Sequence, residues 1–463
     1  MSVSQTHLGS PPADANPRLR VMLDAPIVPM LARMSSPNIL MMLAQSSTGL
    51  IETWWLAKLG TNVLAGIAVV VPVLMLMQNM SQGAMGGGIS ASVARALGTG
   101  NSDLANELAL HAVVLTGVIG LVFAIALTVL ARPLFEMLGA HDAALMAATA
   151  YGHVLFAGLP LMWVMNALAS IVRGTGNMVV PGIVICAGAV ILIPLSPCII
   201  FGIGPFPQLG AAGGAWALVA YYAAGTAVLG CYCMSDRNAA RLRFGKLSFA
   251  PIRRIFAIGG LACVNPILTN SIVGLTGAAV AAHAGTAALA GYATAARLEY
   301  VLMPIAFGLG APMVALVGAN IGAGQHRRGR NIALTGGAMA FLIAETLGIA
   351  ASIWPSRWLL LFGGNEQLLE TGSTYLHIVA PFYGFFGLGF ALYFASQGAS
   401  QLRWPLIAGG LRLVIFAGIG TLILQSGGSL KLFFAAGAVG MLVYGITVAW
   451  SVSAWRSTSS SVD

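Results

Sequence analysis

Charged side chains are scarce in this chain, and that scarcity sets the class of protein before any motif is considered. Only 8% of its 463 residues are Asp, Glu, Lys or Arg, while 58% are hydrophobic. Soluble domains carry about 25% charged residues, so a soluble body of this length would lack the charges needed to cover its surface. Lipid must therefore be the main solvent of the chain, and a soluble multidomain protein is excluded.

Cysteine and acidic residues are also too few for metal or covalent chemistry. The five cysteines lie in apolar runs without repeated paired spacing, which favours neither a disulfide framework nor a zinc site. An intramembrane enzyme such as a prenyltransferase would need clustered Asp to hold Mg²⁺ and diphosphate. Only Glu52, Glu299 and Glu345 lie well inside apolar stretches, far apart in sequence. We therefore expect no catalytic site, no metal and no cofactor.

The sequence does contain a long series of apolar runs. Each run is long enough, at a rise of about 1.5 Å per residue, to cross about 30 Å of hydrocarbon. Prolines within several runs, such as Pro72, Pro160 and Pro381, predict bends in the helices. The predicted fold class is an all-α polytopic membrane protein with twelve transmembrane helices, at residues 37–58, 62–84, 108–131, 150–171, 179–203, 209–233, 258–282, 291–318, 332–354, 373–396, 405–425 and 432–454.

The distribution of Lys and Arg predicts the orientation of these helices. With the N-terminus inside, sixteen Lys and Arg fall in inner segments, four in outer segments, and two, Arg297 and Arg412, inside spans. An excess of Lys and Arg marks cytoplasmic loops, so both termini are expected in the cytoplasm and the protein in the cytoplasmic (inner) membrane of a cell. The same bias explains the basic composition, so no nucleic-acid partner is expected.

The chain divides at its midpoint. The loop at 234–257 is the longest and most basic between spans, and therefore reads as a linker between two halves. The predicted organisation is a cytoplasmic N-terminal segment, an N-lobe of helices 1–6, the cytoplasmic linker, a C-lobe of helices 7–12 and a cytoplasmic tail. Their ranges are 1–36, 37–233, 234–257, 258–455 and 456–463.

The two halves are copies of one unit. With an offset of 224 residues, Tyr151 meets Tyr375, Gly174 meets Gly398 and Pro181 meets Pro405. Further upstream the offset is 225, so that Gly60 meets Gly285. Because each copy holds an even number of spans, the copies share one orientation, and their pseudo-twofold axis runs along the membrane normal. This arrangement places a cavity between two lobes and suits alternating access by rocking.

Several Gly-rich segments at span ends resemble the multidrug and toxic compound extrusion (MATE) family. They are Ile51-Glu52-Thr53 followed by Leu59-Gly60-Thr61 and Leu64-Ala65-Gly66, Ala94-Arg95-Ala96-Leu97-Gly98-Thr99-Gly100-Asn101, Arg173-Gly174-Thr175-Gly176-Asn177 with Pro181, the run from Pro197 to Gly210, and Gly318-Ala319-Asn320-Ile321-Gly322-Ala323-Gly324 after Pro312. Each segment alone is weak evidence for the family, but five of them, in order and at the corresponding span ends, are specific evidence for it. The resemblance covers nearly the whole chain beyond residue 26.

The resemblance implies two parallel six-helix lobes forming a V. It also implies a cation-coupled antiporter that exports small organic, cationic and amphipathic compounds, driven by H⁺ or Na⁺. The expected partners are such a small-molecule substrate and the lipid bilayer, with the protein as a monomer. A flippase for a lipid or polymer precursor, built on a related fold, stays open as an alternative.

One helix face in the N-lobe is the candidate coupling-cation site. Gln45, Thr48 and Glu52 are spaced by three, four and seven residues, so they share one face of the first span. A charge at bilayer depth is a functional candidate by default. The resemblance implies the same role, since one prokaryotic branch carries Asp and Gln at the Glu52 and Gln45 positions. That branch's fifth-span Asn and Asp fall on Leu192 and Ser196 here, which implies a simpler site with one carboxylate.

The C-lobe offers a second set of polar residues. Asn270 aligns with Gln45 in the repeat and stands at a position where another branch of the family carries an acid; that branch's second acidic position falls on Phe386. Arg297 and Glu299 lie in the eighth span but, two residues apart, do not share a helix face. These three residues are candidates for a polar or substrate site. Glu345 and Arg412 are buried charges in need of partners, and a Glu345–Arg412 pair is one possibility.

Aromatic residues of the tenth span are candidate substrate contacts. Phe382, Phe386, Phe390 and Tyr393 recur at helical spacing and offer ring faces to an aromatic cation. Packing against neighbouring helices is the alternative explanation of the same stripe.

Overall fold

The computed structural model describes residues 17–363 and 366–455, and every regular element within these ranges is a helix. The first half contains α1 (Pro17–Asp24), α2 (Ile27–Ala57), α3 (Thr61–Gln78), the π-helix η1 (Asn79–Met85), α4 (Gly86–Gly98), α5 (Ser102–Met137), α6 (Asp142–Ala157), α7 (Leu159–Gly174), α8 (Val179–Phe201) and α9 (Gly210–Met234). The second half contains α10 (Phe249–Ala262), α11 (Val264–Gly322), α12 (His326–Ile353), α13 (Pro355–Leu359), α14 (Glu366–Val379), the 3₁₀-helix η2 (Ala380–Phe382), α15 (Tyr383–Ala399), α16 (Arg403–Leu413), the π-helix η3 (Val414–Ile419), α17 (Gly420–Gln425) and α18 (Leu430–Ser453).

The helices account for the twelve predicted crossings. Ten helical stretches in the described residues are long and apolar enough to span a membrane, or eleven if the bent pair α6 and α7 is counted as one span. One of the ten, 249–322, has 74 residues, and at 1.5 Å per residue it would be about 110 Å long. It breaks at Gly285, whose φ of 80° and ψ of −177° are not helical. The stretch therefore holds the two crossings predicted at 258–282 and 291–318.

Several helices begin earlier than the hydropathy of the sequence predicts. Helix α2 begins at Ile27 rather than residue 37, and α10 begins at Phe249 rather than residue 258. Both early turns carry Arg and exposed positions, so they fail as apolar spans although their backbone is helical. The predicted tail 456–463 and residues 1–16 lie outside the described residues.

Several of the breaks in the helices are not at proline. Pro72 lies inside continuous α3, whereas the π-helical turns η1 and η3 contain no proline. Two prolines do mark breaks as predicted: α6 and α7 bend by 46° just before Pro160, and Pro381 lies in η2. Proline is tolerated within membrane helices when neighbouring groups satisfy the freed carbonyl, which explains why its presence alone overpredicts bends.

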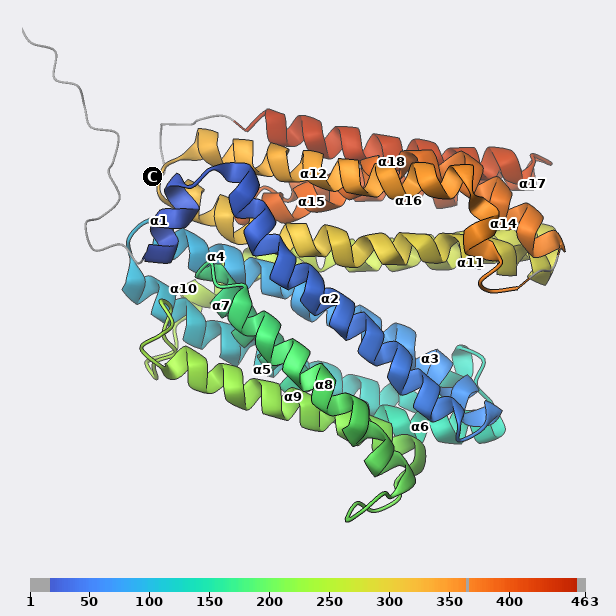
Figure 1. Ribbon diagram of the computed structural model, residues 1–463, viewed down its shortest axis with the longest axis horizontal. Coiled ribbons are helices and arrows are strands. Elements are labelled where there is room, and N and C mark those ends of the chain that lie inside the picture. Colours follow the sequence, from blue (N-terminus) through green and yellow to red (C-terminus); the bar gives the residue numbers. More distant parts are fainter. Residues whose placement is uncertain (1–16, 364–365, 456–463) are drawn as a thin grey trace, which may run out of the picture.

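The two halves form two lobes arranged as a V (Figure 1). The lobes come together at the end where α1 and the end of α18 lie, and they diverge toward the opposite end. We call the end where they meet the apex. There Arg95 Nη2 donates hydrogen bonds to the Gly398 carbonyl and to Ser400 Oγ, both at 2.7 Å. Because both described chain ends lie at the apex, the positive-inside expectation would make the apex cytoplasmic.

The first helix of each half crosses between the lobes. Near its start, Asn38 of α2 donates to the carbonyls of Phe307 and Gly308 in the second half, at 3.2 Å each, before α2 runs down the N-lobe (Figure 1). Correspondingly, α10 packs on the first half: a Cβ on Gly259 would lie 2.6 Å from Met85 Sδ. The predicted boundary at residue 258 thus separates the two sequence copies, while the packing of their first helices is interleaved.

Close helix contacts repeat with the predicted offset. A Cβ on Gly98 would lie 2.2 Å from the Ala319 carbonyl oxygen, and one on Gly322 would lie 2.3 Å from that of Arg95. Since Ala319 is 224 residues after Arg95, these two contacts are one contact seen from each side of a pseudo-twofold axis. Gly174 likewise meets the Ser90 carbonyl, as Gly398 meets that of Val314. The internal repeat is therefore built into the packing at the apex.

The linker between the halves is anchored on α5. The backbone N–H of Arg241 donates to Asn106 Oδ1 at 2.6 Å, and that of Ser248 donates to His111 Nε2 at 2.8 Å. His111 is fully buried, and its Nδ1 lies 2.7 Å from the Glu107 carbonyl oxygen. Both ring nitrogens are thus used, and the basic linker has a defined position at the end of the N-lobe.

Candidate functional site

The N-lobe encloses one carboxyl group without a cationic partner. Glu52, on the last turns of α2, is 6% exposed and accepts a hydrogen bond of 3.2 Å from the Tyr151 hydroxyl of α6. A Cβ on Gly214 of α9 would lie 3.0 Å from Glu52 Oε1, so the missing side chain leaves room for the carboxyl. None of the salt bridges among the described residues includes Glu52. Three helices therefore position a buried acid, and among the described residues its side-chain hydrogen-bond partner is a phenol.

The other two residues of the predicted N-lobe site do not join Glu52. The Thr48 hydroxyl is buried and donates to the Ala44 carbonyl of its own helix at 2.8 Å. Gln45, half-buried, lies beside Tyr221 of α9 rather than beside the carboxyl. The shared helix face was correctly predicted, but the nearest partner of Glu52 comes from a helix 99 residues away.

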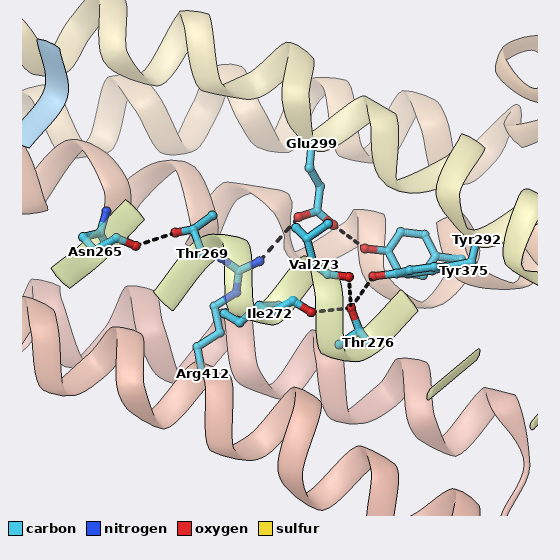
Figure 2. Close-up of polar contacts among 9 residues, drawn as sticks. All are labelled: Asn265, Thr269, Ile272, Val273, Thr276, Tyr292, Glu299, Tyr375 and Arg412. Carbon is cyan, nitrogen blue, oxygen red and sulfur yellow. Dashed lines mark hydrogen bonds and ion pairs between the residues drawn. The ribbon is translucent and has the colours of Figure 1, made fainter. Parts of the chain in front are cut away.

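In the C-lobe, Glu299 is held by two partners (Figure 2). It lies in the second part of α11, after the break. Arg412 Nη2 of α16 is 3.4 Å from its Oε2, and Tyr375 of α14 donates a short hydrogen bond to its Oε1. The side chains of Arg412 and Glu299 are 6% and 17% exposed. Arg412 Cζ also lies 4.8 Å from the centre of the Phe386 ring, an arrangement that favours a cation.

A second pair of hydroxyl groups lies beside this cluster. The hydroxyls of Thr276 and Tyr292 lie 2.8 Å apart, and the Tyr292 ring meets that of Tyr375 edge to face with centroids 5.2 Å apart (Figure 2). Thr276 donates to the carbonyl of Ile272 on its own helix at 2.6 Å. The Glu299 cluster joins α11 to α14 and α16, the Thr276–Tyr292 pair joins the two parts of α11, and ring packing rather than a hydrogen bond connects the two groups.

The structure corrects the proposed Glu345–Arg412 pair. Arg412 pairs with Glu299, while a Glu345 oxygen accepts the backbone N–H of Gly384 at 2.8 Å. Gly384 is the second residue of α15, so Glu345 supplies an acceptor to an N–H at the start of a helix, where a carboxylate is favourable. Glu345 therefore caps the helix that begins after the break at η2.

Two other C-lobe candidates lie outside the Glu299 cluster. Asn270 is exposed and donates to the Pro266 carbonyl of its own helix at 2.8 Å. Arg297 is exposed and lies over the Phe362 ring, 5.4 Å from its centre. The structure does not bring Asn270 and Arg297 together with Glu299, and a role of these residues in a polar or substrate site stays a prediction.

The aromatic stripe is split between two environments. Phe386 and Phe390 stack with centroids 5.7 Å apart and line a pocket with about 250 Å³ of empty space, together with Asn265, Thr269, Arg412 and Tyr444. Tyr393 is buried and donates to the Ala262 carbonyl at 2.9 Å. Phe382 belongs to η2 and meets Phe385 instead. Two of the four aromatic residues therefore face one pocket, and substrate contact by any of the four stays a prediction.

Comparing the lobes reveals a tyrosine–carboxyl pair in each. Tyr151 and Tyr375 are equivalent in the repeat, and each donates to a glutamate. The glutamates are not equivalent, since Glu52 comes from the first span of its lobe and Glu299 from the second. The alignment of the two tyrosines was the available signal in the sequence, and it did not show what they would contact. Among the described residues, no three His, Cys, Asp or Glu side chains gather as a metal site would require.

Comparison with known proteins agrees with this architecture. The family described as MatE matches residues 37–198 and 263–422. A protein of Shewanella oneidensis named FAD transporter is 29% identical over 81% of this chain and 82% of its own length. A Bacillus subtilis protein named probable multidrug resistance protein YoeA is 24% identical over 75% of this chain and 76% of its own length.

The fold is also shared with solved structures. A MOP superfamily transporter from Pyrococcus furiosus superposes with a TM-score of 0.87 at 19% identity, covering 95% of this chain and 98% of that one. Family members are transporters, which excludes the intramembrane enzyme. With the family matched on both halves and two parallel six-helix lobes in place, the chain belongs to the MATE family of multi-pass membrane transporters.

Proposed function

We propose that this protein is an antiporter that exports small organic compounds by alternating access, and that Glu52 carries its coupling cation, H⁺ or Na⁺. The observation that carries the proposal is the contrast between the two intramembrane glutamates bound by tyrosines. Glu299 has a guanidinium beside it, whereas Glu52 is buried with one phenol hydroxyl. An ionised carboxyl without a cation is costly inside an apolar lobe, so binding of a cation would stabilise ionised Glu52.

The geometry suits a carboxyl that loads and releases its cation. The Tyr151 hydroxyl donates to Oε1, which stabilises an ionised form, and a hydroxyl can also accept a hydrogen bond from a protonated one. Loading and release require that water reach Glu52 in one conformation of the N-lobe and be excluded from it in the other. If the two conformations differ in affinity for the cation, linkage requires that the cation changes their populations and hence the affinity for cargo.

The chemical class of the exported compound is indicated by the relatives and by the recesses. The family resemblance implied cationic amphipathic compounds, and one relative is named as a multidrug resistance protein. Another is named as an FAD transporter, and FAD carries a diphosphate. Two recesses among the described residues are lined by Arg173 and by Arg412, and neither has a carboxyl group in its lining. We therefore propose export of amphipathic organic compounds without restricting them to cations.

The test is the change Glu52→Gln, which keeps the shape of the side chain and removes its charge. Everted vesicles holding wild type or variant are energised, and cargo-dependent release of the proton gradient is recorded with a panel of dyes, antibiotics and flavins. A second arm imposes a sodium gradient without a pH gradient. Ion-driven export should vanish in Glu52→Gln, and the arm that is active in the wild type identifies the cation.

Glu345→Gln is the matched control, because it changes an intramembrane glutamate that also lacks a cationic partner. It should retain ion-driven export. Full export by a well-expressed Glu52→Gln protein would contradict the proposal and move the coupling site to the C-lobe. If no compound is exported by the wild type while a labelled lipid precursor crosses the membrane, the flippase alternative is correct.

A further inference from the structure

A second recess lies at the apex between the lobes. It has about 220 Å³ of empty space and is lined by Gln82, Gly83, Gly86, Gly87, Ser90, Arg173, Phe307, Ala311, Val314 and Phe394. Gly87 and Ala311, and likewise Ser90 and Val314, are equivalent pairs in the 224-residue repeat, and both members of each pair line the recess. The recess is therefore on the pseudo-twofold axis, with one half supplied by each lobe.

The two halves of this recess differ in chemistry although they are copies of one unit. The N-lobe half presents Gln82, Ser90 and Arg173, which are 6%, 3% and 3% exposed. Gln82 Nε2, Ser90 Oγ and Arg173 Nη1 are buried and have no hydrogen-bond partner. The C-lobe half presents Phe307, Ala311, Val314 and Phe394, and the two phenylalanine rings meet edge to face with centroids 5.2 Å apart.

Arg173 is the charge in this recess. Its Nη2 donates to Ser170 Oγ at 2.8 Å, and no salt bridge among the described residues includes it. Arg173 lies in the last turn of α7, where the helix dipole favours a cation. Its Nη1 nevertheless has no hydrogen-bond acceptor. Arg95 of the apex also has one buried nitrogen without a partner, Nε, but its Nη2 donates to a carbonyl and a hydroxyl across the lobe interface, which Arg173 does not do.

The repeat shows what a structural residue at this position looks like. The residue equivalent to Arg173 is Gln397, which is neutral and fully buried. Its Nε2 donates to the Gly83 carbonyl at 3.3 Å, and its Oε1 is buried without a partner. The interface can thus be closed at this position without a charge. Burying a guanidinium with an unsatisfied Nη1 costs free energy, which a bound anion would recover.

We propose that the apex recess binds the anionic head group, a phosphate or a carboxylate, of an amphipathic aromatic compound. The anion is held by Arg173, Gln82 and Ser90, and the adjoining ring lies against Phe307 and Phe394. Three donors facing an apolar wall match this combination of an anion and a ring. In this conformation the enclosed part of the recess, about 10 Å³, has room for no more than a water molecule, so the compound enters only when the lobes separate around the recess. That this compound is the exported cargo rests on the proposed function; the binding site does not.

Three probes with the same naphthalene ring system and different head groups test the charge preference. They are 1-naphthyl phosphate, neutral 1-naphthol and cationic 1-naphthylmethylamine, titrated by naphthalene fluorescence into the full-length protein in nanodiscs of zwitterionic lipid. The phosphate should bind at least tenfold more tightly than the other two. Equal affinity for all three probes, or preference for the amine, would overturn the proposal.

Variants of the lining residues test the location of the site. Arg173→Gln copies the equivalent residue of the C-lobe and should weaken binding of the phosphate at least tenfold, while binding of the amine stays unchanged. Gln82→Leu with Ser90→Ala should weaken it severalfold and serves as the second variant if Arg173→Gln does not fold. Arg132→Gln, at an exposed pair far from the apex, is the control. Wild-type affinity for the phosphate in folded Arg173→Gln, or in the folded Gln82→Leu and Ser90→Ala double variant, would contradict the assignment.

A further arm identifies the source of the anion. The same titration in nanodiscs containing phosphatidylglycerol measures competition by an anionic lipid. Competition that disappears in Arg173→Gln supports the anion site and makes a lipid head group its occupant, whereas no competition makes the occupant a soluble compound. No ion gradient is present, so a failure of coupling at Glu52 would leave these results unchanged.

Discussion

Removing the charge of Glu299 should destabilise the C-lobe, and the contacts in Figure 2 allow the size of the effect to be stated. The change Glu299→Gln leaves Arg412, whose side chain is 6% exposed, without its counter-ion. Loss of one partner of a buried ion pair costs about 3–5 kcal/mol. The pair is a single contact of 3.4 Å, so we expect the lower end of that range, about 3 kcal/mol.

The double change Glu299→Leu with Arg412→Met provides the matched comparison. Replacing both members of a buried pair by apolar residues is often neutral or stabilising, so this variant should recover most of the lost stability. Unfolding is followed by the loss of the monodisperse peak on size exclusion after heating in detergent. A Glu299→Gln protein as stable as wild type, or a double variant less stable than the single one, would refute the idea that the pair is structural.

Three further changes probe the N-lobe, the apex and the linker. Gly214→Ala places a Cβ 3.0 Å from Glu52 Oε1, so the cation concentration giving half-maximal export should change at least threefold, whereas Gly230→Ala on the same helix, with its nearest neighbour at 3.9 Å, should leave it unchanged. Gly322→Ala forces a Cβ to 2.3 Å from the Arg95 carbonyl, so the lobes must separate and a cysteine placed at the apex should react faster with a maleimide than in Gly329→Ala. His111→Phe keeps the volume of a buried ring but removes the acceptor for Ser248 N–H, so trypsin should cut the linker sooner than in wild type; unchanged cleavage would show that the linker is held elsewhere.

The number of crossings and the repeat were predictable because lipid imposes simple rules. A helix must contain about twenty apolar residues to cross hydrocarbon, and this length is visible in one sequence. The contacts of Gly98 and Gly322 are also encoded locally, since only glycine allows two backbones so close together. By contrast, the extra turns of α2 and α10 lie beyond the apolar region, where a helix need not be hydrophobic.

Pairing between distant polar residues could not be predicted in the same way. Glu299 meets Arg412 across 113 residues, and Glu52 meets Tyr151 across 99. Helix periodicity specifies the face of a residue but not the helix that will pack on it. The expected Glu345–Arg412 pair failed for this reason, since any of several helices can supply the partner of a buried charge, and a helix N-terminus took the place of a cation at Glu345.

The difference between the lobes suggests how one repeated unit came to serve two purposes. Tyr151 and Tyr375 show that each copy keeps a phenol directed toward a carboxyl group. In the C-lobe the carboxyl is neutralised by Arg412 on α16, whereas the repeat position equivalent to Arg412 in the N-lobe is Gly188, which has no side chain. Of the two glutamates bound by tyrosines, Glu299 therefore has a cationic partner and Glu52 has none among the described residues. The proposed coupling role of Glu52 rests on this difference, whereas the C-lobe pair joins α11 to α16.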